Sequence, residues 1–354
     1  MVAENATAGL VDWDAAAGIG KRFAGPGPQV RPAERARMAE EFDDIVAEAD
    51  SLVTEFTGLA IDGPASRPWV MTRREWIEQN LRGFEQVLEP VARRLLGRRM
   101  DGTMAPVRRQ LLAFQVGGIL GYLGRKVLGQ YDLFLPPDDR DLIYFVGPNV
   151  VELERRFRFG RLDFRLWLSL HEVTHRVQFE GVPWLRPHIT ELMGSYLGTI
   201  DLDARKVLER LRRVREELRS GSAGEWRDLG VLFAFMTPEQ RVTFRRMQSL
   251  MSVLEGHGNF VMNRLAEGRV RGAARMRRTL QQRRNRKGFN RMVQRAVGMD
   301  VKARQYDIGE RFVAEVVDRA GPEGFARIWE RSEHLPSLEE VGRPEAWIER
   351  VAAA

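Results

Sequence analysis

Apolar residues recur at helical spacing along most of the chain. One clear case is the segment 73–96, where Trp76, Ile77, Leu81 and Phe84 fall on one face of a helix. A shorter run at 142–146 is apolar and β-favouring and stops at a Gly-Pro-Asn turn, which predicts a buried strand. We therefore expect a mainly α protein with a small β-sheet. The helices are predicted over 33–56, 73–96, 107–128, 163–180, 203–219, 238–265, 301–320 and 344–351.

Several local signals fix where helices begin and how they pack. Thr237 precedes Pro238 and is a plausible N-cap, and residues 337–340 (Ser-Leu-Glu-Glu) have the form of a capping box. The segment 107–128 contains four glycines, but no strand precedes them and their spacing does not fit a dinucleotide-binding loop. We interpret them as a site of close contact between helices. They are Gly117, Gly118, Gly121 and Gly124.

A break rich in Pro and Asp at 133–139 suggests a boundary in the chain. We predict an N-terminal helical lobe over residues 1–135. The remaining residues, 136–354, are expected to form a catalytic lobe that includes a basic segment at 269–298 and the C-terminal helices.

Composition narrows the class of protein. The chain has 354 residues, of which 44% are hydrophobic and 30% charged, which is typical of a globular protein with a core. It has no Cys, which excludes disulfides, thiol catalysis and zinc sites built on thiolates. The longest apolar run, at 111–124, is shorter than the roughly 20 residues that span a bilayer, and the N-terminus has no signal-peptide pattern. We expect a cytoplasmic protein with no membrane partner.

Positive charge is concentrated in one segment. Of the net charge of +7, eleven Arg or Lys lie between Glu267 and Asp300 without any acid, which leaves 7 − 11 = −4 for the rest. Such a segment could bind nucleic acid through its phosphates. However, Phe289 is the one aromatic residue there, so bases would have little to stack on. We favour a solvated face and do not expect nucleic acid as a partner.

Residues 171–175, His-Glu-Val-Thr-His, form a candidate metal-binding segment. On a helix, His171 and His175 lie on one face, close enough for both imidazoles to reach one Zn²⁺. Glu172 is turned about 100° from His171, so it can take a proton from zinc-bound water. The pattern is notable because the chain has few His. They are His171, His175, His188, His257 and His334.

The rest of this helix supports the metal interpretation. Apolar residues cover most of its surface, and polar groups are costly in such a place unless they have partners. A narrow polar wedge of Arg165, Ser169 and Arg176 remains. The alternative is that Glu172 pairs with Arg176 on a solvated wedge and that both His are ordinary core residues.

A third ligand is needed, and the sequence offers several. Glu255 interrupts an apolar stripe on the helix 238–265, where a carboxylate requires a partner. Gly256 and Gly258 would let another helix approach there, and Asn259 could hold a ligating His in place. His257 points to the other side of that helix, so we favour a core or supporting role for it. The remaining alternatives for the third ligand are His188 and Glu191.

Zinc hydrolases also need a group that stabilises the oxyanion. We consider four candidates without choosing among them. They are Tyr144, His188, His257 and Tyr306.

Taken together, the segments 171–179, 183–187 and 254–257 resemble those of the type 2 zincin-like metallopeptidases. The resemblance extends from Val11 to Trp329, nearly the whole chain. It implies a zincin-like core, zinc ligands at His171 and His175, Glu172 as base and Glu255 as third ligand. Members of that family are associated with deazaflavin-coenzyme biosynthesis, which gives no substrate. The chain departs from the related gluzincin pattern at Asn259, where an Asp is usual.

We therefore expect a zinc-dependent hydrolase that acts on a peptide or other amide bond. Two alternatives stay open. One is an inactive protein that keeps the zincin fold as a binding module. The other is a nucleic-acid binder that uses the basic segment 269–298.

Overall fold

The computed structural model describes residues 9, 11–96, 105–198, 236–285 and 299–352. The chain divides into two compact units. Unit 1 contains residues 1–180 and 268–272, and unit 2 contains residues 181–267 and 273–354. The predicted lobe boundary at 135/136 falls inside unit 1, so the compact units divide the chain elsewhere.

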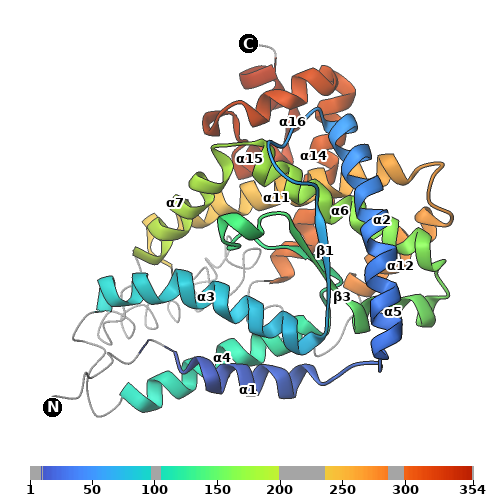
Figure 1. Cartoon of the computed structure of the whole chain (residues 1–354). Helices are drawn as coiled ribbons and strands as arrows, with labels where there is room; N and C mark the ends of the chain where they lie inside the picture. Colours follow the sequence, from blue (N-terminus) through green and yellow to red (C-terminus); the bar gives the residue numbers. More distant parts are fainter. Residues whose placement is uncertain (1–8, 10, 97–104, 199–235, 286–298, 353–354) are drawn as a thin grey trace. The chain divides into compact units, whose positions relative to one another are not determined.

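Unit 1 is built around a three-stranded sheet in the order β1-β3-β2. Strand β1 (Arg67–Met71) runs parallel to β3 (Leu142–Val146), and the two lie side by side in Figure 1. Strand β2 (Gly129–Tyr131) runs antiparallel to β3 on its other side. All five residues of β3 are buried, which confirms the strand predicted at 142–146. A central strand with both neighbours in place satisfies its backbone groups inside the core.

Two helices of unit 1 cross closely because glycines remove the side chains between them. Helix α1 (Trp13–Ala24) packs on α4 (Ala105–Gly124). A Cβ added to Gly117 would lie 2.5 Å from the Ala16 carbonyl oxygen. One added to Gly121 would lie 2.7 Å from the Gly20 carbonyl oxygen. The predicted helix–helix contact is thus confirmed at these two positions.

The described part of unit 1 also contains four further α-helices and the short 3-10 helix η2 (Pro137–Asp139). Helix α2 (Pro32–Thr57) packs on β1, and α3 (Arg73–Leu96) contacts α1, α4 and the sheet. Helix α5 (Gly147–Phe157) leaves β3 directly and is followed by α6 (Arg161–Gly181). Because α6 begins and ends close to the predicted 163–180, the helix carrying the His-Glu-Val-Thr-His segment is confirmed.

Unit 2 is helical. It begins with α7 (Leu185–Gly198), and the long helix α11 (Pro238–Ala266) starts with the predicted Thr237 cap, here a complete capping box with Gln240. Helix α14 (Met299–Ala326) bends at Gly321, where φ is 77°. The last turns start with a second capping box at Ser337. The other elements are α12 (Ala273–Asn285), η3 (Arg327–Trp329), η4 (Ser332–His334), α15 (Leu338–Gly342), α16 (Pro344–Trp347) and η5 (Ile348–Ala352).

Helices α11 and α14 approach each other closely. A Cβ at Gly256 would lie 2.2 Å from the carbonyl carbon of Gly309, and one at Gly309 would lie 2.0 Å from the Ser252 oxygen. The close helix contact predicted at Gly256 is therefore confirmed, one residue away from Glu255.

The predicted class, mainly α with a small β-sheet, is confirmed. The helix predicted at 203–219 lies outside the described residues, as does part of the basic segment, 286–298. Among the residues that the structure describes, no helix is both long and apolar enough to cross a bilayer.

Candidate metal centre

Three polar residues of helix α6 are buried inside unit 1. The side chains of Arg165, Ser169 and Arg176 are almost fully inaccessible to solvent, so the wedge that they form does not face water. Arg165 makes ion pairs with Glu154 (2.8 Å) and Glu41. The alternative of a solvated wedge is therefore wrong, because carboxylates from α2 and α5 pair with it.

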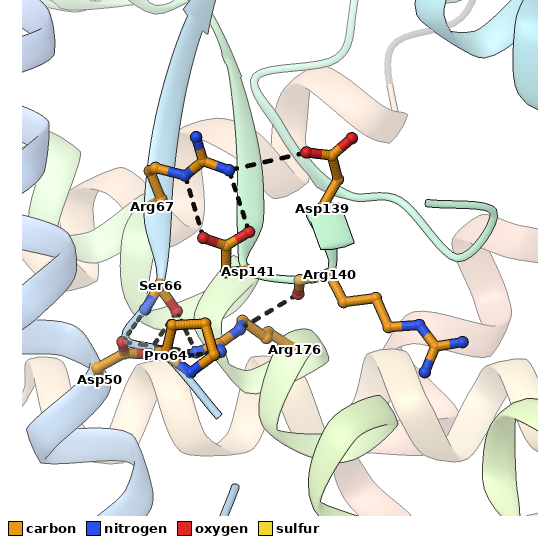
Figure 2. Close-up of polar contacts among 8 residues, drawn as sticks. All are labelled: Asp50, Pro64, Ser66, Arg67, Asp139, Arg140, Asp141 and Arg176. Carbon is orange, nitrogen blue, oxygen red and sulfur yellow. Dashed lines mark hydrogen bonds and ion pairs between the residues drawn. The ribbon is translucent and has the colours of Figure 1, made fainter. Parts of the chain in front are cut away.

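Arg176 fixes the other end of α6. Its guanidinium donates to Ser66 Oγ (2.9 Å), to the Pro64 carbonyl and to the Arg140 carbonyl (3.4 Å). Figure 2 shows these contacts, together with Asp50, which accepts hydrogen bonds from both N and Oγ of Ser66 at 2.6 Å. Arg176 thus ties the helix to the segment that enters β1, rather than serving as the partner of Glu172.

The imidazoles of His171 and His175 converge. Their Nε2 atoms are 3.2 Å apart, and the ring planes are nearly perpendicular. Two ligands at about 2.05 Å from a tetrahedral zinc ion are themselves roughly 3.3 Å apart. The spacing therefore fits two lone pairs that share one ion.

Gln178 orients one of these rings. The Nδ1 atom of His175 lies 2.9 Å from Oε1 of Gln178, whose side chain is fully buried. The amide oxygen accepts the Nδ1–H proton, which leaves the lone pair on Nε2 for a metal. A hydrogen bond of this kind sets both the tautomer and the orientation of a ligating histidine.

Glu172 is buried and lies against the sheet edge. A Cβ at Gly129 of β2 would lie 2.6 Å from Cγ and 2.8 Å from Oε1 of Glu172. Strand β2 is held on both sides of this point: Gln130 accepts from Trp76 of α3 (2.7 Å), and Tyr131 donates to Glu180 of α6 (2.6 Å). The missing side chain at Gly129 therefore provides the space that the Glu172 carboxylate occupies.

The other predicted site residues of this region lie on α11 in unit 2. Glu255 is half-buried, whereas His257 and Asn259 are buried. The His257 ring packs against Phe325 and Trp329, with centroid distances of 5.3 and 5.2 Å. This aromatic environment suits the core or supporting role favoured for His257. Glu255 as third ligand to the two imidazoles of α6 stays a prediction, and its carboxylate is a donor that zinc accepts.

The oxyanion candidates occupy different environments. Tyr144 is buried in β3 against Trp69, and this burial raises the pKa of its phenol, so it remains a neutral donor. His188 lies on α7 beside Trp184, where burial lowers the pKa of its imidazole. Tyr306 belongs to α14, but its side chain is outside the described part of the chain. The role of each stays a prediction.

Comparison with known proteins defines the class of protein. The family model for zincin-like metallopeptidases matches residues 11–348, so the chain belongs to that family. A metal cofactor, typically zinc, is implied by this membership.

One solved structure is similar over almost its full length. It is the crystal structure of "a putative hydrolase with a novel fold" from Chloroflexus aurantiacus, 34% identical in sequence, with a TM-score of 0.71. The alignment covers 96% of this chain and 98% of the other. No curated protein matches the sequence. The family resemblance, the zincin-like fold class and an assignment among hydrolases are thereby supported.

Two residues of the site were not identified from the sequence. Gln178 stands three residues after His175, within reach of that ring, but a single amide at this spacing is not by itself a signal of a metal site. Gly129 carries no local signal, because its function depends on a strand and a helix that are remote in sequence.

Proposed function

We propose that this protein is a zinc-dependent hydrolase that cleaves a peptide or other amide bond. The observation that carries the proposal is the 3.2 Å separation of the His171 and His175 Nε2 atoms, with Gln178 holding the second ring from behind. In the absence of an ion, an Nε2–H···Nε2 hydrogen bond accounts for this contact, and the same spacing lets both imidazoles bind one zinc ion once that proton is lost.

His171, His175 and Glu255 would hold the ion. Neutral imidazoles and a carboxylate are ligands that zinc accepts, and three protein ligands leave a position open for chemistry. When bound, zinc would polarise the scissile carbonyl and lower the pKa of a water molecule. Membership in a metallopeptidase family supports zinc and an amide substrate over other metals and reactions.

Glu172 would act as the general base. It is adjacent in sequence to His171 but points toward β2, so it does not compete for the ion. Its carboxylate would accept a proton from the attacking water and later deliver that proton to the departing amine.

The test is metal analysis of the purified chain followed by hydrolysis of a peptide library, with and without chelator. We expect bound zinc, turnover that stops on chelation, and recovery when zinc is returned. The matched variant is Glu172→Gln, which keeps the volume but cannot take a proton. It should retain zinc and lose ~10²-fold or more in rate.

Other outcomes separate the alternatives. Zinc without turnover on any peptide or amide would favour the inactive zincin-fold binding protein. Absence of metal uptake on titration would contradict the proposal itself. For the nucleic-acid alternative, the described part of the basic segment includes Arg277, which already pairs with Glu310 at 2.7 Å. Tight, salt-dependent binding of RNA or DNA would be needed to support that function.

A further inference from the structure

A cavity in unit 1, separate from the proposed zinc ligands, is lined by strongly charged side chains. It lies among α2, α5 and the first turns of α6 and has a volume of about 510 Å³. Such a volume is in the range of sites for small organic ligands. The lining residues are Arg31, Ala33, Glu34, Arg37, Met38, Glu41, Val151, Glu154, Arg155, Arg161 and Arg165.

The cavity carries an excess of positive charge. Five of its lining residues are arginines and three are glutamates, so 5 − 3 leaves two positive charges unbalanced. None of the lining residues is Lys or His, so this excess consists of guanidinium groups alone. Guanidinium stays protonated at every pH at which a protein is folded.

The three glutamates are all paired within the cavity wall. Glu34 accepts from Arg155 at 3.1 Å, and Glu41 accepts from Arg161 at 2.8 Å. Glu154 binds the buried Arg165 at 2.8 Å. The carboxylates are therefore already neutralised by arginines that hold the wall together.

The excess resides on Arg31 and Arg37. Within the residues that the structure describes, neither makes an ion pair or a side-chain hydrogen bond, and both are exposed. Arg31 is the N-cap residue of α2 and Arg37 lies in its second turn, next in sequence to Met38. Two unpaired guanidinium groups at one cavity attract a single group of double negative charge, because Arg donates paired hydrogen bonds to phosphate oxygens.

The floor of the cavity is apolar. Met38 and Val151 line it and are themselves almost fully buried, with 1% and 3% of their surface exposed. Ala33 lines the cavity as well and is exposed, so a ligand can reach an apolar side chain there. A compact apolar body attached to the anionic group would cover it.

We propose that this cavity binds a small organic phosphate monoester, with its dianionic group held by Arg31 and Arg37 and its apolar part against Ala33, beside Met38 and Val151. The assignment is independent of the proposed zinc chemistry. It requires no residue of the metal centre.

The test is calorimetric titration of the full chain with phenyl phosphate. We expect saturable binding in the millimolar range or tighter, about tenfold weaker binding of inorganic phosphate, and little binding of the monoanion benzoate. Binding should weaken below about pH 6, where a phosphate monoester loses its second charge. Metal-free protein should bind equally well, which excludes phosphate bound to zinc.

Variants locate the site. The double variant Arg31→Gln, Arg37→Gln should bind phenyl phosphate at least tenfold more weakly while its thermal unfolding stays unchanged, because both residues are exposed and outside the ion pairs. Arg74→Gln, an exposed arginine of α3 that does not line the cavity, is the control and should bind normally. An equal loss in the control, binding that depends on zinc, or no saturation by about 10 mM ligand would overturn the proposal.

Discussion

The Glu172 side chain lies against the α-carbon of Gly129, in the place where any other residue would have its Cβ. The proposed general base thus depends on a glycine in an edge strand that is 43 positions away in sequence, since 172 − 129 = 43. The atoms that a new Cβ would meet belong to a flexible side chain rather than to backbone. A substitution there should therefore move the carboxylate and leave the fold in place.

Gly129→Ala should reduce hydrolysis about 10–100-fold, because displacing a general base by about 1 Å disrupts its alignment. Zinc content and unfolding temperature should stay near those of the wild type. The control is Gly118→Ala on α4, where an added methyl group meets nothing within 4 Å. Wild-type kcat in Gly129→Ala would mean that the Glu172 carboxylate tolerates displacement or does not act as base.

Gln178→Leu should weaken zinc binding by about 10–100-fold, the usual effect of losing a partner that orients a ligating histidine. Leu preserves volume in the fully buried position but cannot accept the Nδ1–H of His175. Gln178→Glu keeps an acceptor at this place and should restore most of the affinity. Competition titration with a chromophoric chelator measures both. Equal affinities in Gln178→Leu and wild type would show that the 2.9 Å contact does not position the ring.

Glu255→Ala and His257→Ala should behave differently. We expect Glu255→Ala to be purified largely without metal, since it loses a direct ligand. His257 packs between Phe325 and Trp329, so His257→Ala should keep its zinc and unfold at lower temperature. Elemental analysis of the zinc content of the two purified variants shows which of the two residues is the third ligand. If His257→Ala is the metal-free variant, the ligand set consists of three histidines instead.

Arg176→Ala should be much more destabilising than Arg67→Ala. Arg176 is buried and donates to Ser66 and two carbonyls, so its loss leaves those groups unsatisfied at a cost of about 3 kcal/mol. Arg67 pairs with Asp141 at 3.0 Å but is more than half exposed, and such pairs contribute about 0–1 kcal/mol. The contacts of both arginines appear in Figure 2. Urea unfolding gives the free energy of unfolding of each variant. Similar losses of stability would show that the buried contacts do not hold α6.

The sequence predicted the long elements because their signals are local. Helical periodicity, the caps at Thr237 and Ser337 and the apolar run at 142–146 each act within a few residues. Strand β2 was missed because three residues, one of them Gly, carry no alternating pattern. Strand β1 was missed because it begins with Arg-Pro, a poor strand signal.

The sequence predicted only part of the candidate site, because it shows local spacing but not contacts between remote segments. His171, Glu172 and His175 have a spacing that the helix itself imposes. Arg165 and Arg176 read as a polar strip on a helix surface, yet they are buried because their partners come from remote positions. One of those partners is Glu41, which lies on α2. Hydrophobic periodicity predicts each helix separately and does not show which helices contact each other. Only the folded chain shows that the strip is internal.

The two buried guanidinium groups of α6 have a consequence for how a metal would be acquired. Arg165 lies before the histidine pair and Arg176 after it, and neither contact involves the ion. Folding alone therefore fixes the part of α6 that carries the imidazoles, so much of the entropy of bringing them together is lost before any metal arrives. If zinc binds as proposed, the two histidine ligands are held on a helix that is already formed, and we expect the ion to leave and return without unravelling it.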